Sequence, residues 1–236
     1  MSTGDENTCP LLGVVIPVYH AGDQLSALLD QLKRCDLPTQ VVVVQGGTAD
    51  MSTASDSERD VFVIRSDRHG RGHQLRLGIA HLNTPWYLIL HADSRLTGDW
   101  QQAVQRFITN VVHKDKAGYF DFQLNIDSRK ARLLEQLVQW RCRVFGLPYG
   151  DQGLLIPRQL LELCGGVPDL PLMEDVQLAR KLTRRRLKRI GVPLLTSARH
   201  YLEHGFVRRS AQNVLFLLLF YVGVKPVTLY RWYYRK

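Results

Sequence analysis

Four short runs of apolar residues, mostly β-branched or aromatic, constrain the fold of this chain more than any other feature. They are residues 12–18 (LGVVIPV), 40–45 (QVVVVQ), 61–65 (VFVIR) and 86–91 (WYLILH). Continuous apolar runs of this length are typical of strands buried on both faces of a parallel sheet. Segments with helical spacing separate them, at Leu25, Leu28, Leu29 and Leu32 and again over residues 71–82. This alternation predicts βαβ units, and hence an α/β fold with a mostly parallel central sheet flanked by helices.

The second half of the chain is less regular, although it also mixes strands with helices. Residues 119–126 (YFDFQLNI) alternate in the manner of a half-exposed strand, and residues 153–157 predict a short strand. A helix is predicted over about 127–145, followed by the Gly/Pro loop GLPYGDQG. We predict a basic helix over 174–189, since seven cations lie between Arg180 and Arg189.

The length of 236 residues suits one large domain or two small ones. We find no internal repeat and no linker rich in Gly or Ser, which favours a single domain. We therefore expect a disordered lead at 1–10, one α/β domain at 11–205 and a helical tail at 206–236.

The charge and the cysteines limit the classes of partner and compartment. The formal net charge is +9, which favours an anionic partner such as a nucleic acid, a membrane surface or a phosphorylated substrate. The sequence shows no helix-turn-helix, zinc-finger or RNA-binding signature, so we do not expect nucleic acid binding. The four cysteines have no C-x-x-C spacing, and no apolar signal segment follows the acidic start. Free thiols and a cytoplasmic location are the expectation, with peripheral contact at the inner membrane face left open.

The C-terminal tail combines an apolar run with cations and interfacial aromatics. Residues 214–224 (VLFLLLFYVGV) are nearly all apolar but too few to span a bilayer, which takes about 20 residues. Arg208, Arg209 and Lys225 flank the run, and Tyr and Trp residues follow it. Such a pattern fits a helix lying on an anionic membrane surface. A buried C-terminal helix or a dimer contact fits it equally well.

Four clusters lie where predicted strands end, the edge at which open parallel sheets bind ligands. They are Pro17–His20, Gln45–Asp50, His91–Ser94 and Met173–Val176. Tyr19 could stack on a flat base, and the glycines after Gln45 let the backbone approach a ligand closely. A carboxylate such as Asp93 can hold Mg²⁺ or Mn²⁺, and Asp175 could act as a general base.

Each cluster also has a purely structural explanation. Asp50 and Asp93 could cap helices, and acids at the start of a helix, as at Glu174 and Asp175, are stabilised by the helix dipole. The clusters become specific only when they are taken together.

Together they resemble the family 2 glycosyltransferases, which have the GT-A (Rossmann-like) fold. The matching elements are IPVYHAGDQL (16–25), VVVVQGGTAD (41–50), GRGHQLRLGIAHLNTPWYLILHADSRL (70–96) and GLPYGDQGLLIPRQLLELCGGVPDLPLMEDVQLARKL (146–182). The resemblance covers roughly residues 11–225. In particular, the last two elements resemble a bacterial subgroup that occurs beside radical-SAM and selenium-linked genes.

The resemblance implies a binding site for a nucleotide-diphosphate sugar in the first half of the chain. By position, the residues involved are Pro17, Tyr19, Gln45, Gly46, Arg71, Gln74, His91, Ala92 and Asp93. Gln45 replaces an Asp that reads the base in many members, and Gln can still hydrogen-bond a uracil edge, so a UDP-sugar is favoured. His20 and Ala21 also replace the Asn and Glu common in the family.

The resemblance also implies the reaction. The triplet from His91 to Asp93 takes the place of the family's D-x-D motif, with Asp93 as the ligand of Mg²⁺ or Mn²⁺. Asp175 aligns with the catalytic base and Glu174 with its neighbour, while Asp151 and Gln152 are expected to border the sugar and the acceptor. An inverting displacement follows, with an acceptor that the sequence does not identify; the apolar, basic tail favours a lipid or a membrane-adjacent one.

One alternative of another class stays open, and a second is disfavoured. The replaced acids at positions 21, 45 and 91 would suit a non-catalytic protein that binds a nucleotide or a lipid on a transferase scaffold. A nicotinamide-binding Rossmann enzyme is disfavoured, because it would need G-x-G-x-x-G after the first strand, where this chain has Ile16 to Tyr19.

Overall fold

The computed structural model describes residues 11–19, 22–47 and 61–234. The predicted lead at 1–10, the replaced pair His20 and Ala21, and the candidate cap Asp50 lie outside the described residues.

Within the described residues, eight strands form one sheet in the order β3-β2-β1-β4-β7-β6-β8-β5. They are β1 (Leu12–Val18), β2 (Thr39–Gly46), β3 (Val61–Ser66), β4 (Trp86–Ile89), β5 (Arg95–Leu96), β6 (Ala117–Leu124), β7 (Leu154–Pro157) and β8 (Leu187–Thr196). The first four strands of the order are parallel, and β6 and β8 are parallel to each other. Only β7 and β5 run antiparallel to their neighbours. The predicted α/β fold with a mostly parallel sheet is confirmed.

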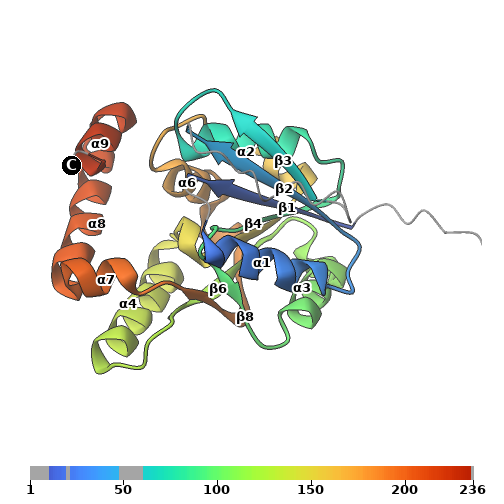
Figure 1. Ribbon diagram of the computed structural model, residues 1–236, viewed down its shortest axis with the longest axis horizontal. Helices are drawn as coiled ribbons and strands as arrows, with labels where there is room; N and C mark the ends of the chain where they lie inside the picture. Colours follow the sequence, from blue (N-terminus) through green and yellow to red (C-terminus); the bar gives the residue numbers. More distant parts are fainter. Residues whose placement is uncertain (1–10, 20–21, 48–60, 235–236) are drawn as a thin grey trace, which may run out of the picture.

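Helices cover both faces of the sheet (Figure 1). They are α1 (Asp23–Lys33), α2 (Arg71–Ala80), α3 (Trp100–Thr109), α4 (Arg129–Phe145), α5 (Arg158–Leu163), α6 (Glu174–Arg186), α7 (Arg199–His204), α8 (Phe206–Tyr221) and α9 (Pro226–Tyr233), with short 3-10 turns η1 (Val111–His113) and η2 (Gly150–Gln152). Figure 1 shows α7, α8 and α9 stacked in a column along one side of the domain, with the C-terminus at α9.

The buried core divides into two layers because strand residues alternate between the faces of the sheet. Val42 and Val44 of β2 pack with residues of α2 on one face, whereas Val41 and Val43 pack with α1 and α3 on the other. Helix α2 approaches the sheet closely: a Cβ added at Gly78 would lie 2.6 Å from Val15 Cγ1. Burial on both faces explains why these strands are continuous apolar runs.

Three sequence predictions need correction. The strand predicted at 86–91 ends at Ile89, although the N–H of Leu90 still donates to Val15 O at 3.1 Å, and Ala92 and Asp93 then form a turn. Strand β6 is buried except at Gln123, and not half-exposed, because α3 and α4 cover its two faces. The basic helix predicted to 189 ends at Arg186, and Thr183 already has a left-handed φ of 59°.

The basic residues that suggested a longer helix instead begin strand β8. This strand pairs with β6, and Arg189 forms an ion pair with the largely buried Asp121. In the sequence, a strand residue whose charge is paired with a buried residue of the next strand looks the same as a charged residue on a solvent-exposed helix. The run of cations therefore predicted a helix where the chain forms a strand.

The tail forms the helices α8 and α9, as expected, and it packs against the domain. Phe216 and Leu229 are buried, and Phe206, Leu217 and Phe220 pack on the core. Among the described residues, no helix is long and apolar enough to cross a membrane.

Candidate active site

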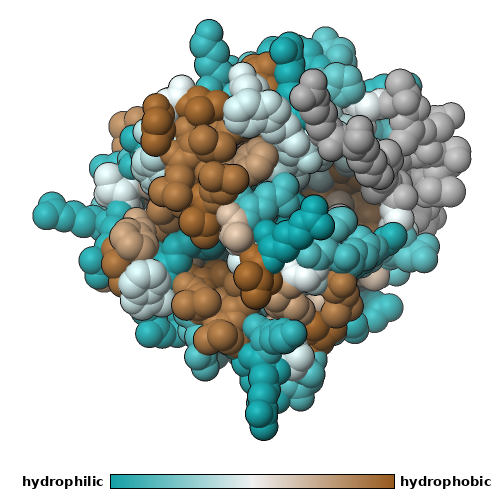
Figure 2. Space-filling model, turned by 90° about the vertical axis from the view of Figure 1, so that its left-hand side faces the viewer, coloured by the Kyte–Doolittle hydropathy of each residue, from teal (hydrophilic) through white to brown (hydrophobic). Residues whose placement is uncertain are grey.

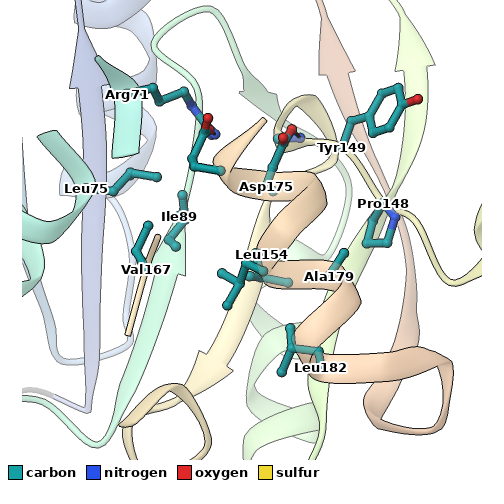
Figure 3. A pocket seen from close by; sticks show the side chains of 14 residues that line it. Arg71, Leu75, Ile89, Pro148, Tyr149, Leu154, Val167, Asp175, Ala179 and Leu182 are labelled. Carbon is teal, nitrogen blue, oxygen red and sulfur yellow. Dashed lines mark hydrogen bonds and ion pairs between the residues drawn. The ribbon is translucent and has the colours of Figure 1, made fainter. Parts of the chain in front are cut away.

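A cavity of about 320 Å³ lies beyond the end of β4, between the domain and the C-terminal helices. Its wall brings together residues that are far apart in the sequence. They include Arg71, His91, Asp93, Tyr149, Asp151, Glu174 and Asp175 from the domain and Arg209, Asn213, Phe216, Tyr233 and Tyr234 from α8 and the end of the chain. A smaller, mostly apolar hollow lies beside it, with Arg71 and Asp175 at its polar end (Figure 3).

Arg71 and Glu174 form a largely buried ion pair in this wall. Each begins a helix, α2 and α6 respectively, and the N–H of Gly72 donates to Leu170 O at 3.1 Å, which holds the two helix starts together. The Glu174 side chain is 4% exposed and that of Arg71 19%. Burial raises the pKa of Glu174 to about 7, although Arg71 opposes the shift. Burial would lower the pKa of Arg71, but Glu174 and Asp175 outweigh it and raise the value.

Arg71 keeps two donors that the described residues do not satisfy. Its Nε and Nη2 are buried and have no hydrogen-bond partner in the described part of the chain. The guanidinium lies against Gly150, where an added Cβ would be 2.6 Å from Nη2. A buried donor without a partner costs about 1–3 kcal/mol, so this arginine is arranged for a ligand with acceptor oxygens.

Asp175 lies beside this pair at the start of α6. Its Oδ2 accepts from the N–H of Gly150 at 2.7 Å, and its Oδ1 accepts from the N–H of Val176 at 2.7 Å. The preceding residue, Met173, has a left-handed φ of 66°, a conformation that costs a non-glycine residue about 1–3 kcal/mol. This conformation of Met173 places Glu174 and Asp175, in the first turn of α6, in the cavity wall. Strained backbone conformations of this kind are common at functional sites.

The segment after β4 carries the predicted metal ligand. Asp93 lines the cavity, and its carboxylate is 33% exposed. Nδ1 of His91 lies 3.9 Å from Oδ1 of Asp93. Burial, and then the charge of Arg71, lower the pKa of His91 well below its ordinary value, so the ring is neutral at pH 7. Ala92 packs on the core, and the buried hydroxyl of Ser94 has no partner among the described residues.

The loop before β7 contributes Asp151, whereas Gln152 faces inward. Oδ1 of Asp151 is buried without a partner in the described residues, and burial raises the pKa of this carboxyl to about 6. Arg141 lowers that pKa, and Asp175 and Asp93 raise it. The Gln152 side chain accepts from Arg141 Nη2 at 3.0 Å and donates to Phe120 O at 3.2 Å, which ties the loop to α4 and β6. Gln152 does not line the cavity.

The residues predicted for the nucleotide at β1 and β2 lie apart from the cavity wall. Gln74 donates to Val18 O at 2.9 Å and Val44 O at 2.8 Å, so its amide joins the ends of the two strands. A Cβ at Gly46 would lie 2.8 Å from Nε2 of Gln74. Gln45 is 3% exposed, and its Nε2 has no partner in the described part of the chain. Pro17 lies within β1, in register with Val44.

Tyr19 is covered by the C-terminal helix. Its hydroxyl is 2.9 Å from that of Tyr230, and its ring stacks on Tyr234 with centroids 6.4 Å apart. Nδ1 of His69 lies 3.0 Å from the same hydroxyl. Burial and Tyr230 raise the pKa of Tyr19 above its ordinary value. A base that stacks on Tyr19 would therefore meet α9.

Sequence reasoning missed the contribution of α8 and α9 to the cavity. Arg209, Asn213 and Phe216 recur at helical spacing on one face of α8, and they line the cavity together with Tyr233 and Tyr234. That spacing was visible in the sequence, but the apolar run beside it suggested a membrane or core contact instead. The inner face of α8 is a wall of the candidate site.

The carboxylates in the cavity wall suit a divalent cation whose coordination shell is completed by oxygens of a bound ligand. Asp93 offers a partly exposed carboxylate, and Asp151 a buried carboxylate oxygen without a partner among the described residues. No group of three or more His, Cys, Asp or Glu side chains suited to a metal occurs in the described ranges. A cation here would therefore take its remaining ligands from phosphate oxygens and water.

Comparisons with known proteins bear on this arrangement. Residues 13–118 match the sequence model of the family described as glycosyl transferase family 2. The fold is similar to that of the mannosyltransferase PcManGT from Pyrobaculum calidifontis, solved with GDP-Man and Mn²⁺, at 19% identity and a TM-score of 0.65; the alignment covers 95% of this chain and 68% of that one. It is also similar to S. aureus TarS 1-349, at 13% identity and a TM-score of 0.60, covering 93% and 68%. A comparison with curated protein sequences gave no match.

A further structure of S. aureus TarS 1-349, in complex with UDP-GlcNAc, matches at 14% identity with a TM-score of 0.60, covering 79% of this chain and 58% of that one. At these identities the solved structures show the fold alone. The first half of the chain thus carries the sequence pattern of the family 2 glycosyltransferases, on a GT-A fold that it shares with a solved mannosyltransferase.

Proposed function

We propose that the protein is a glycosyltransferase that transfers a sugar from a nucleotide-diphosphate sugar to a hydroxyl or phosphate acceptor. The observation that carries this proposal is Arg71, a largely buried cation in the wall of a cavity that also holds Asp93 and Asp175. Two of its N–H groups have no partner among the described residues. A diphosphate supplies acceptor oxygens for such N–H groups, and its negative charge adds to that of Glu174 on the arginine. The sequence match over 13–118 and the complexes of PcManGT with GDP-Man and TarS with UDP-GlcNAc support it.

Asp175 is the proposed general base. Its two oxygens already accept backbone N–H groups, which fixes the carboxylate, and each oxygen keeps a lone pair for an acceptor hydroxyl. The acceptor oxygen forms a bond to the anomeric carbon and gives its proton to Asp175. The bond from that carbon to the diphosphate breaks, and its electron pair leaves with the diphosphate, so the configuration inverts.

Glu174 and Arg71 serve the leaving group. Glu174 holds the guanidinium in place, and Arg71 then faces the negative charge that develops on the diphosphate. Asp93 would hold Mg²⁺ or Mn²⁺, with Asp151 as a second carboxylate in the same cavity wall, and such a cation would neutralise the same charge. The Mn²⁺ named with PcManGT supports this assignment.

The donor base is proposed to be uracil, read by the amide of Gln45, whose Nε2 has no partner among the described residues and which can both donate and accept. Asp151 is proposed to border the sugar and the acceptor. Gln152 is proposed to act indirectly, by keeping the loop of Asp151 tied to α4. The assignment to the subgroup found beside radical-SAM genes stays a prediction.

Thermal unfolding with UDP, GDP, CDP and ADP, each with and without Mn²⁺, tests the donor class. A ligand at about 100 times its Kd stabilises the folded state by about 2.7 kcal/mol. We expect a metal-dependent rise in Tm with UDP. If no nucleotide raises the Tm, the chain is a scaffold that has lost the donor site.

The base is tested by Asp175→Asn. We expect the transfer rate to fall by about 10²–10⁴-fold while the nucleotide-dependent rise in Tm is kept. Asp127→Asn is the matched control, because Asp127 is 79% exposed and pairs only with the exposed Arg132 in the described structure. Turnover of Asp175→Asn at the parent's rate would exclude Asp175 as the base.

A further inference from the structure

Helix α4 exposes an apolar stripe that the fold does not cover. Leu133, Leu137, Trp140 and Val144 follow helical spacing and are 43–58% exposed. Phe145, also exposed, packs edge-on against Trp140 with centroids 5.4 Å apart. Isolated exposed apolar side chains are ordinary, but a continuous stripe that ends in an exposed Trp/Phe pair marks an interaction surface.

Helix α8 exposes a second stripe on the side turned away from the cavity. Val207, Val214, Leu218 and Val222 are 53–84% exposed, whereas Arg209, Asn213 and Phe216 face inward to the cavity. Figure 2 looks onto the side of the molecule that carries α8 and α9, and it shows neighbouring apolar patches surrounded by hydrophilic side chains. Helix α4 lies on this side as well (Figure 1). We call the two stripes together the α4–α8 face.

The charge around this face is strongly positive. Helix α4 contains five Lys and Arg residues and one acid, and the stretch from Phe206 to Tyr234 contains four cations and no Asp or Glu. Of these, Arg129, Lys130, Arg143, Arg208, Lys225 and Arg231 are exposed. Trp140 and Trp232 are about half-exposed beside them, a position typical of aromatics at a membrane interface.

We propose that the α4–α8 face docks on an anionic lipid bilayer, with α4 and α8 lying together in the headgroup region. Apolar stripes flanked by cations are the pattern of interfacial helices. The surface therefore extends beyond the C-terminal tail to a helix inside the α/β domain. A second copy of the chain fits this face less well, because two such basic surfaces would repel each other.

The arrangement has a geometric consequence for the cavity. Helix α8 has the bilayer on its outer side and the cavity on its inner side, so one helix separates the substrate site from the membrane. The docking itself does not depend on the proposed transfer reaction.

Flotation of the full chain with lipid vesicles tests the proposal. We expect binding to vesicles containing about 30% phosphatidylserine, weaker binding to pure phosphatidylcholine vesicles, and a decrease as salt rises from about 0.1 to 0.5 M. The decisive variant is Leu137→Glu with Trp140→Glu, which alters α4 and leaves the tail intact. Loss of two apolar anchors and gain of two negative charges should weaken binding at least tenfold.

The matched control is Val111→Glu with Val112→Glu. Both valines are 70% exposed in η1, which follows α3 on the opposite side of the molecule from α8 (Figure 1). We expect this control to bind vesicles like the parent, and both double variants to keep the parent's Tm. A nucleotide-dependent rise in Tm, measured in parallel, reports on the proposed function separately.

Three results would overturn the proposal. The intact chain might bind no vesicles; the α4 variant might bind as well as the control; or light scattering might show a dimer that the α4 variant converts to monomer. The last result would make a second copy the occupant of this face.

Discussion

The ion pair between Arg71 and Glu174 gives the most direct test of the site's energetics. In Arg71→Met, the Glu174 carboxylate stays buried without its partner. Removing one member of a buried pair costs about 3–5 kcal/mol, and the 4% and 19% exposure of these side chains places the pair in that class. Methionine also removes the two N–H groups that have no partner in the described ranges, which offsets part of the cost. We therefore expect a loss of about 3 kcal/mol, a large share of the 5–15 kcal/mol typical of a domain.

Urea unfolding at pH 8 measures this loss, with Arg158→Met as the control. Arg158 pairs with Glu162 on the surface of α5, where the side chains are 43% and 62% exposed. Exposed pairs of this spacing contribute about 0.3–0.5 kcal/mol, so the control should lose several times less. The double variant Arg71→Met with Glu174→Met should recover most of the stability, because a buried ion pair can be replaced by apolar residues at little cost.

The loss in Arg71→Met should also depend on pH. Glu174 has a pKa of about 7 in the folded protein against 4.5 for an ordinary Glu, and removal of Arg71 raises the folded value further. A raised carboxyl pKa reduces stability as the pH rises above 4.5, so the loss should be larger at pH 8 than at pH 5. Equal losses for Arg71→Met and Arg158→Met at pH 8 would refute the buried-pair argument.

Two further perturbations follow from the same structure. Gly72→Ala would place a Cβ 2.3 Å from Pro168 O and 2.6 Å from Leu170 O. These clashes should exceed the gain in helix propensity of about 1 kcal/mol, so the Tm should fall. Gly22→Ala, with nothing within 4 Å, meets no such clash and should lower the Tm less, by the loss of a favourable N-cap residue alone. Asp151→Asn should stabilise the protein at pH 8 by up to about 3 kcal/mol, because the pKa of Asp151 in the folded protein is about 6 against an ordinary 3.8. The gain should vanish below pH 4, where the carboxyl is protonated in both the folded and the unfolded protein. Equal stability of parent and variant across this range, measured by thermal unfolding, would refute the burial of that carboxylate.

Local sequence was sufficient where an element is buried on both faces. The runs at 12–18 and 40–45 predicted β1 and β2 nearly to the residue, because a strand covered on both sides must be apolar throughout. It was insufficient for β8, where Lys188 and Arg189 resemble a solvated helix and only the pairing with β6 and Asp121 decides the conformation.

The candidate site also contains some residues that the sequence predicted correctly as cavity residues and others that it did not. Arg71, Asp93, Glu174 and Asp175 were predicted from their motifs, and all four lie in the wall of one cavity. The sequence also grouped Gln74 and Gln152 with them, but Nε2 of Gln74 joins β1 to β2, and the amide of Gln152 holds its loop to α4 and β6. A motif shows which residue types occur at a position, whereas a buried polar side chain must satisfy its own hydrogen bonds first.

The sequence by itself determined the α/β class, the parallel half of the sheet and the identity of the acids and the arginine at its edge. These follow from periodicity and from residue chemistry, which are local properties of the chain. Only the tertiary structure decided that Arg71 pairs with Glu174 and that Tyr19 meets Tyr230. It also decided that α8 is both a wall of the cavity and part of an exposed apolar surface. Contacts between residues more than a hundred positions apart depend on how helices pack on the sheet, and no local pattern encodes that packing.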